Sequence, residues 1–143
     1  MKPFVLAVLL LALPQPILDA LEARFPGAEI RKWSKEKEHG AVLYDVEFTH
    51  AGLKLEADMT PDGKIDNWEK EIAAADLPAV VRDAALAKHP GARIVEVMEM
   101  TNVVEGKDAL GGYEIVLEPK GGKKTEIAVA PDGKILEEDG DDD

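Results

Sequence analysis

The sequence of 143 residues contains no cysteine, so disulfide bonds, thiolate metal ligands and cysteine nucleophiles are excluded. Its only serine is Ser34, and the surrounding sequence supplies neither a nucleophile elbow nor a group to orient a base. The three histidines, His39, His50 and His89, lack the spacing of metal-binding motifs such as H-E-x-x-H. There is also no P-loop and no Rossmann glycine pattern. We therefore expect a protein that is not an enzyme, with no catalytic, cofactor-binding or metal-binding residues.

Basic residues are scarce: 17 lysines and arginines stand against 29 aspartates and glutamates, which gives a formal net charge of −12. Binding to nucleic acid or to an anionic membrane surface needs clustered positive charge, so neither is expected as a partner. Proteins and cations stay open as partners, and the simplest alternative is that the acidity only keeps the protein soluble. A hydrophobic content of 45% is sufficient for one domain or for two small ones.

Hydrophobic runs are short except at the start of the chain, where Lys2 precedes an apolar run from Phe4 to Leu11. This pattern is typical of a secretory signal peptide, which we place at residues 1–12. The run is too short to span a bilayer as a helix, which takes about 20 residues. We expect a secreted or periplasmic protein. The alternatives are an uncleaved anchor, as the one route to the membrane, and an N-terminal strand of the core.

The remainder of the chain contains an internal repeat with two copies, residues 13–72 and 77–138. Three markers recur in the same order: Leu13-Pro14 and Leu77-Pro78, Pro26-Gly27-Ala28 and Pro90-Gly91-Ala92, Pro61-Asp62-Gly63-Lys64-Ile65 and Pro131-Asp132-Gly133-Lys134-Ile135. The spacing between the copies is 64 residues at the first marker and 70 at the last. The second copy therefore contains an insertion, which we place in a glycine-rich loop at residues 105–112.

Hydrophobic periodicity predicts the same elements in each copy. Apolar residues with helical spacing predict helices over 14–25 and 78–89. Period-two alternation between turn residues predicts four strands after each helix, at 28–37, 42–49, 53–60 and 64–72, then at 92–101, 112–118, 123–130 and 134–138. Short connections imply antiparallel pairing. The predicted fold class is α+β, with two tandem repeats, each one helix followed by a four-stranded antiparallel sheet, helices packed on one sheet face, and an acidic tail at 139–143.

No carboxylate pair is singled out for acid–base chemistry. Asp45 and Glu114 correspond by the repeat, as do Glu56 and Glu126, but all four are predicted on the polar sides of strands. The two Asp-Gly turns are explained by turn chemistry, because the ligand pattern of an EF-hand does not follow either of them. Weak calcium binding by the acidic tail stays open.

Trp33, Tyr44 and Trp68 are the large aromatic residues singled out outside the predicted helices of the first copy, and we expect them in the core. A tryptophan on the open sheet face would instead be an anchor for a partner, because exposed aromatic residues dominate interface energetics. Of the histidines, His50 is expected to be exposed in a turn, and His89 to be partly buried at a helix end.

Each copy resembles the PepSY-like domains of bacterial envelope proteins, in the tandem form described as beta-lactamase-inhibitor-like. The resemblance rests on the Leu-Pro start, the amphipathic helix, Phe25 or His89 before Pro-Gly-Ala, a strand with Tyr44 or Tyr113, and the final Pro-Asp-Gly-Lys-Ile. It implies a helix packed on an antiparallel sheet, export and no catalytic activity. In the wider family the domain occurs in peptidase propeptides, where it inhibits or assists the peptidase. This chain shows no peptidase segment, and the family offers no binding-site residues to carry over.

The leading hypothesis is an exported, non-catalytic binding module. It would present its polar sheet face, with the 105–112 hairpin as a second surface, to a protein partner such as a peptidase or another envelope protein. The alternative is an acidic envelope protein that binds cations such as calcium weakly or senses them.

Overall fold

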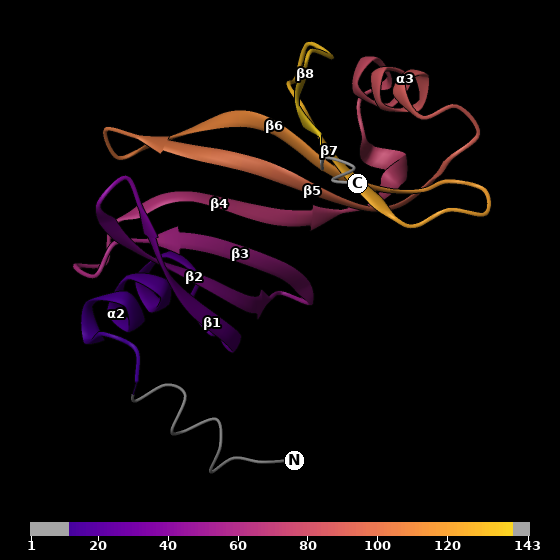
Figure 1. The fold of residues 1–143 in the computed structure, drawn as a ribbon. Coiled ribbons are helices and arrows are strands. Elements are labelled where there is room, and N and C mark those ends of the chain that lie inside the picture. The colour runs from indigo at the N-terminus through magenta and orange to yellow at the C-terminus, as the bar shows by residue number, and fades with distance from the viewer. Residues whose placement is uncertain (1–11, 139–143) are drawn as a thin grey trace. The chain divides into compact units, whose positions relative to one another are not determined.

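The computed structural model describes residues 12–138 (Figure 1). The predicted signal peptide, apart from Ala12, and the acidic tail at 139–143 lie outside the described residues. The first half contains α2 (Gln15–Arg24), β1 (Glu29–Glu38), β2 (Ala41–His50), β3 (Leu53–Met59) and β4 (Ile65–Ile72). The second contains a short 3₁₀ turn η1 (Ala74–Asp76), α3 (Ala79–Lys88), β5 (Arg93–Val104), β6 (Lys107–Glu118), β7 (Thr125–Val129) and β8 (Ile135–Glu138). Neither α-helix of this part of the chain has the length and apolar character needed to cross a membrane.

The predicted fold class is wrong in its main feature. The eight strands form one antiparallel sheet in the order β1 to β8, rather than two separate four-stranded sheets. More than half of the described residues lie in strands, and each α-helix has only 10 residues, so the fold is mostly β. Two separate sheets would leave four unpaired edges, and joining them into one sheet removes two of these. The prediction missed this because periodicity in the sequence says nothing about which edges pair.

The insertion lies in a hairpin, as predicted, but the loop is much shorter than the predicted 105–112. Strand β5 continues to Val104 and β6 begins at Lys107, so that the turn consists of Glu105 and Gly106 alone. Both turn residues have positive φ, 52° and 75°, as the tight turns of two-residue hairpins require. The insertion therefore lengthens two paired strands to 12 residues each (Figure 1).

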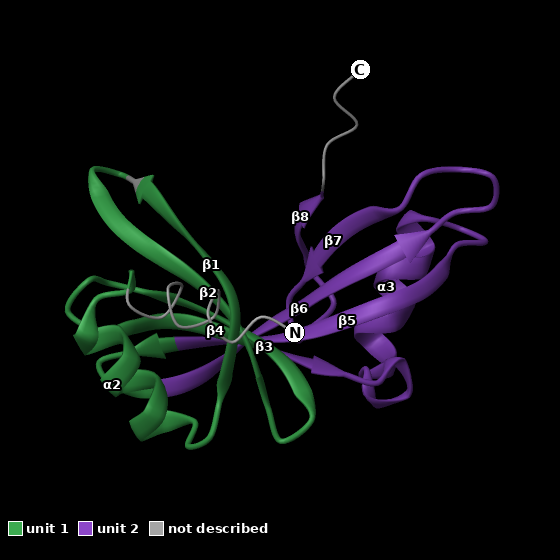
Figure 2. Ribbon diagram, turned by 90° about the horizontal axis from the view of Figure 1, so that it is seen from below, with its two compact units in different colours: residues 1–69, 103–107 green, residues 70–102, 108–143 purple. Residues whose placement is uncertain are grey.

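The chain divides into two compact units (Figure 2). Unit 1 comprises the residues up to 69 together with 103–107, and unit 2 comprises 70–102 together with the residues from 108 onward. Each unit has a hydrophobic cluster of its own, built from one helix and the apolar sides of its strands.

In unit 1 the helix α2 buries its apolar stripe against β2 and β3. The stripe consists of Ile17 and Leu21 of α2 with Leu13 and Phe25 on either side of the helix. It packs on strand residues that include Val46, Phe48, Leu55, Ala57 and Met59. The Phe25 ring lies 5.1 Å from the Phe48 ring and 5.4 Å from the Trp68 ring, between centroids. Full burial of each large apolar side chain is worth about 1.5–3 kcal/mol, so this stripe supplies much of the stability of the unit.

Unit 2 repeats the arrangement with smaller helix residues. Val81 and Ala85 of helix α3, together with Leu77 two residues before it, pack on strand residues that include Val97, Tyr113, Ile115, Leu117, Ile127 and Val129. His89 occupies the position of Phe25, at the C-terminal end of the helix. The apolar stripe therefore ends in a titratable side chain in this unit.

Candidate functional site

Strands β2 and β3 of unit 1 each have one buried side and one polar side. The residues Tyr44, Val46 and Phe48 are buried toward α2, and the alternate positions carry Asp45, Glu47 and Thr49. On β3 the buried residues alternate in the same way with Lys54, Glu56 and Asp58. We call the side of these strands that faces away from α2 the open face of unit 1.

The pairing of β2 with β3 places acidic side chains directly opposite each other. A two-residue turn, Ala51-Gly52, joins the strands and sets the register, so that Asp45 is opposite Asp58 and Glu47 is opposite Glu56. Like charges in directly opposed positions of an antiparallel pair destabilise the sheet. The open face therefore carries two opposed acidic pairs side by side, of which Asp45–Asp58 is the one whose electrostatic cost is visible, because Lys32 approaches Glu47 of the other pair.

With Glu36 of β1, which also acts electrostatically on Asp58, these residues form an acidic patch. The patch consists of Glu36, Asp45, Glu47, Glu56 and Asp58. Basic residues lie toward one end: Lys32 Nζ is 4.0 Å from Glu47 Oε2, and Lys54 is opposite Thr49. The Asp45–Asp58 pair lies toward the other end of the strands.

The surroundings of Asp58 change its protonation. Burial, first, and the neighbouring Asp45 charge raise the pKa of Asp58 from 3.8 to about 6. The hydrogen bond between the two aspartates and the Glu36 charge act in the same direction, while the hydrogen bond with the Asn67 side chain opposes them. The pair therefore holds a proton at mildly acidic pH, where an ordinary aspartate is fully ionised.

Unit 2 lacks the opposed pairs at the equivalent positions. Glu114, the counterpart of Asp45, is opposite Ala128, and Glu126, the counterpart of Glu56, is opposite Val116. Glu114, Glu126 and Ala128 line a small hollow of about 80 Å³ together with Glu137 of β8. The repeat therefore shows that this fold does not require acidic residues facing each other, because unit 2 places its own carboxylates in staggered positions.

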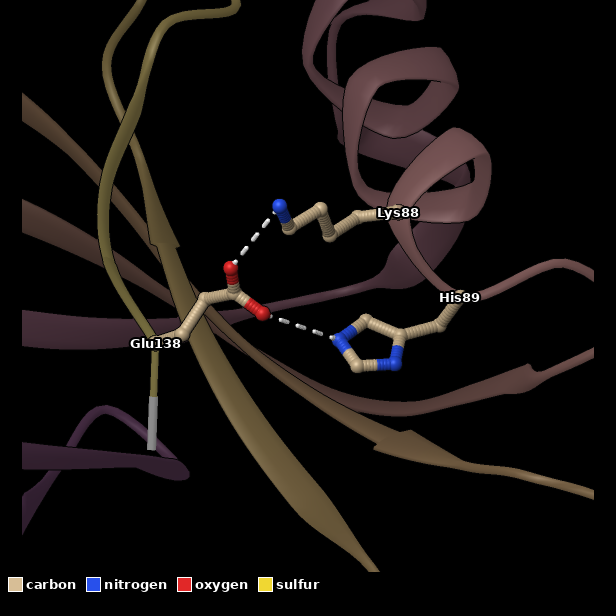
Figure 3. Close-up of polar contacts among 3 residues, drawn as sticks. All are labelled: Lys88, His89 and Glu138. Atoms are coloured by element: carbon tan, nitrogen blue, oxygen red, sulfur yellow. Dashed lines mark ion pairs between the residues drawn. The ribbon is translucent and has the colours of Figure 1, made fainter. Parts of the chain in front are cut away.

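A second polar cluster lies on the α3 side of unit 2 (Figure 3). Glu138, at the end of β8, places Oε1 3.2 Å from Lys88 Nζ and Oε2 3.6 Å from His89 Nε2. The His89 side chain is 26% exposed, which confirms the prediction of a partly buried residue at a helix end. The cluster connects the last strand to the C-terminal end of α3. The positive charge of Lys88 is favourable at that end of the helix.

The other residues considered in the sequence have structural roles. Ser34 lies in β1 opposite Asp45, whereas His39 is in the β1–β2 turn, roughly 16 Å along an extended strand, so the two do not form a catalytic pair. His50 is not the exposed turn residue that we predicted. It is half-buried at the end of β2, with its ring 5.6 Å from the Phe25 ring.

The aromatic residues belong to the core of unit 1, as expected. Trp68 packs edge-on against Phe25, and Trp33 lies 5.8 Å from the Tyr44 ring. Both tryptophans are partly buried against the hydrophobic cluster, so neither is an anchor on the open face.

Within residues 12–138, no group of three or more histidines and carboxylates is arranged to hold a metal ion. The acidic tail, which the calcium alternative invokes, lies outside this part of the chain.

Sequence reasoning matched Asp45 to Glu114 and Glu56 to Glu126 only as equivalent positions of the repeat, and it singled out neither Asp58 nor Glu47. The structure instead brings Asp45 to Asp58 and Glu56 to Glu47. The available signal was the turn at Ala51-Gly52: a two-residue hairpin turn fixes every cross-strand pair by counting outward from it.

Comparison with known proteins shows the fold and leaves the family open. The chain matches none of the protein-family models, and no curated protein is similar to it in sequence. Solved structures do share the fold. A BLIP-like protein of Bacteroides fragilis has 21% identity and a TM-score of 0.59, over 92% of this chain and 91% of the other.

Two further Bacteroides structures match over a slightly smaller share of the chain. A candidate periplasmic protein of Bacteroides eggerthii has 19% identity and a TM-score of 0.65, over 88% of this chain and 87% of the other. A DUF2874 family protein of Bacteroides uniformis has 14% identity and a TM-score of 0.65, over 87% of each chain. At these identities the likeness establishes a common fold.

Proposed function

We propose that this chain is an exported, non-catalytic binding module of two PepSY-like sequence repeats, 13–72 and 77–138, that share one sheet. The acidic patch of unit 1 is its binding surface. The partner is a protein of the cell envelope, such as a peptidase, that presents a surface rich in lysine and arginine.

The observation that carries this proposal is the opposed placement of Asp45 with Asp58 and of Glu47 with Glu56. At neutral pH the Asp45–Asp58 pair costs stability in the free protein, and unit 2 shows that the fold can be built without such opposed pairs. A basic partner surface would convert the repulsion into attraction, and complementary charge also accelerates association. The net charge of −12 also favours a positively charged partner.

The comparisons support the proposal by analogy of fold. A BLIP-like protein and a candidate periplasmic protein are among the solved structures with this fold, in keeping with a binding role and with export. The resemblance of each copy to PepSY-like domains, whose wider family inhibits or assists peptidases, makes a peptidase the first partner to test.

A pull-down from bacterial envelope extract tests the proposal with two variants of equal charge. The patch variant carries Asp45→Asn, Glu47→Gln, Glu56→Gln and Asp58→Asn. The control variant removes four exposed acidic residues elsewhere, with Asp19→Asn, Glu22→Gln, Asp76→Asn and Asp83→Asn. We expect the wild type and the control variant to retain the same protein, and the patch variant to lose at least ten-fold of it.

Circular dichroism on each variant establishes that the fold is intact before capture is compared. Capture that survives in the patch variant would place the binding surface elsewhere. Equal loss in both variants would show that only the net charge matters.

A further inference from the structure

The contact between the end of the helix and the last strand differs in kind between the two units. In unit 1 the Trp68 ring lies 5.4 Å from the Phe25 ring, between centroids, and Arg24 Cζ lies 5.4 Å from the centroid of the Trp68 ring. The repeat offsets of 64 and 70 residues place three ionisable residues at the same positions of unit 2: Lys88, His89 and Glu138. An aromatic contact that does not depend on pH is thus replaced by one that includes a histidine.

The His89 ring lies against the Glu138 carboxylate without a hydrogen bond (Figure 3). His89 Nε2 is 3.6 Å from Glu138 Oε2, and this nitrogen is buried with no hydrogen-bond partner among the described residues. Glu138 Oε1 already pairs with Lys88 Nζ at 3.2 Å, so Oε2 is the oxygen that faces the ring. A buried polar atom without a partner costs stability. A proton on the ring would convert this unsatisfied contact into an ion pair.

The charged groups that the structure places at the ring, within the described residues, are Lys88 of α3 and Glu138 of β8. Lys88 disfavours a positive charge on His89, whereas Glu138 favours it. Strands β6 and β7 contribute buried apolar side chains on this side of the sheet, such as Leu117 and Ile127. Other ionisable groups of these strands have contacts of their own: Glu99 acts on Tyr113, Arg93 pairs with Glu118 at 2.6 Å, and Glu114, Glu126 and Glu137 line the hollow.

The strand that this contact retains, β8, has few other attachments. It has only four residues, Ile135–Glu138, and its pairing with β7 is interrupted by a register shift. The last three of these residues are exposed. Segments with few buried contacts open locally at low cost in free energy. Because β8 is the last strand of the sheet, its detachment would leave β7 as the edge.

We propose that His89 and Glu138 form a pH-sensitive contact, which retains β8 on the sheet at acidic pH and lets it detach more readily at neutral pH. Histidine is the side chain whose charge ordinarily changes between pH 5 and 8. A charged ring attracts Glu138, whereas a neutral ring leaves the buried nitrogen and the carboxylate 3.6 Å apart without attraction between charges. The inference concerns unit 2 and is independent of the acidic patch of unit 1.

Hydrogen exchange of backbone amides, followed by NMR on the full chain at pH 5.5 and 7.5, measures the detachment of β8. Protection factors correct for the pH dependence of exchange itself, and the β6 amides of the same unit are the reference. Ion pairs that are partly exposed contribute little, so a modest effect is expected. The protection of β8 relative to β6 should be about two- to five-fold higher at pH 5.5 than at pH 7.5.

Three variants assign the effect to this contact. Glu138→Gln removes the carboxylate, and His89→Phe introduces the residue that unit 1 has at the same position. Both should make the relative protection of β8 independent of pH. His39→Asn is the matched control, because it removes a histidine from an exposed turn whose φ of 51° asparagine tolerates. This control should keep the wild-type dependence on pH.

The outcomes decide the inference in either direction. Equal relative protection of β8 at both pH values in the wild type would overturn it. So would a dependence on pH that persists in folded Glu138→Gln or His89→Phe, or one that disappears in His39→Asn, because another group would then be responsible. Glu138 lies on an exposed edge strand, so Glu138→Gln stays decisive if His89→Phe does not fold.

Discussion

Asp58 is the residue whose environment departs furthest from that of an ordinary surface aspartate. Its pKa is raised from 3.8 to about 6, so between these values the folded protein binds more protons than the unfolded chain. Stability that depends on this group is therefore complete below about pH 4 and is lost as the pH rises through 6. Most aspartates in ion pairs show the opposite dependence, because their pKa is lowered on folding.

The variant Asp58→Asn should therefore be more stable than the wild type at neutral pH. Asparagine is neutral at every pH and lacks the repulsion from Asp45 and Glu36. We expect a gain of about 1 kcal/mol in the free energy of unfolding at pH 7.5, after discounting for solvent screening of a half-buried group, and almost no gain at pH 4. Urea unfolding at the two pH values measures both. A loss of stability at pH 7.5 would contradict the interpretation that Asp45 and Asp58 repel each other at neutral pH.

At the scale of elements, the turn that precedes β4 packs closely on the start of α2. Gly63 has a φ of 92°, and a Cβ atom built on it would lie 2.5 Å from the carbonyl oxygen of Pro16. The turn is closed by hydrogen bonds from Gly63 N–H to the Thr60 carbonyl and from Thr60 N–H to the Lys64 carbonyl. The Pro-Asp-Gly signal of the sequence thus serves a contact between turn and helix, in addition to reversing the chain.

Substitution of Gly63 should destabilise unit 1 in two ways, through backbone strain at its positive φ and through a collision with Pro16. Gly63→Ala is expected to cost about 3 kcal/mol, because the positive φ strains alanine and the new methyl group meets rigid backbone. Gly40→Ala is the matched control: its φ is 81°, but nothing lies within 4 Å of the new atom, so a cost of about 1 kcal/mol is expected. Urea unfolding gives both values. Equal costs would mean that the contact with Pro16 relaxes freely.

The long hairpin shows what an insertion does at the scale of elements. Glycines in the sequence predicted a loop, but Gly111 and Gly112 lie within β6. Gly112 has a φ of 137°, and a Cβ atom built on it would collide with the Val129 carbonyl oxygen. A glycine in a strand often marks such a close backbone approach, and composition alone does not distinguish it from a loop glycine.

At the scale of the whole molecule, the excess of acidic residues opposes the folded state. A net charge of −12 on 143 residues produces repulsion that unfolding relieves. Salt screens this repulsion, since the Debye length falls to about 10 Å at 0.1 M. The cost is largest where like charges are closest, as on the open face of unit 1.

The free energy of unfolding should accordingly rise with ionic strength at neutral pH. Between low salt and about 0.5 M sodium chloride we expect a gain on the order of 1 kcal/mol at pH 7.5. Urea denaturation across a salt series measures it. The same series at pH 4 is the control, where partial protonation of carboxyl groups should reduce the gain. A fall in stability with salt would show that attractive ion pairs dominate instead.

The amino-acid sequence by itself determined the local elements of this protein. Helical spacing of Ile17 and Leu21 located the first helix, and period-two alternation located the strands, because both signals depend only on neighbours along the chain. The tertiary structure alone decided that all eight strands join in one sheet and that Glu36 of β1 acts on Asp58 of β3. Both depend on which strands pair and in which register, and a slip of a single residue would move every side chain to the opposite face.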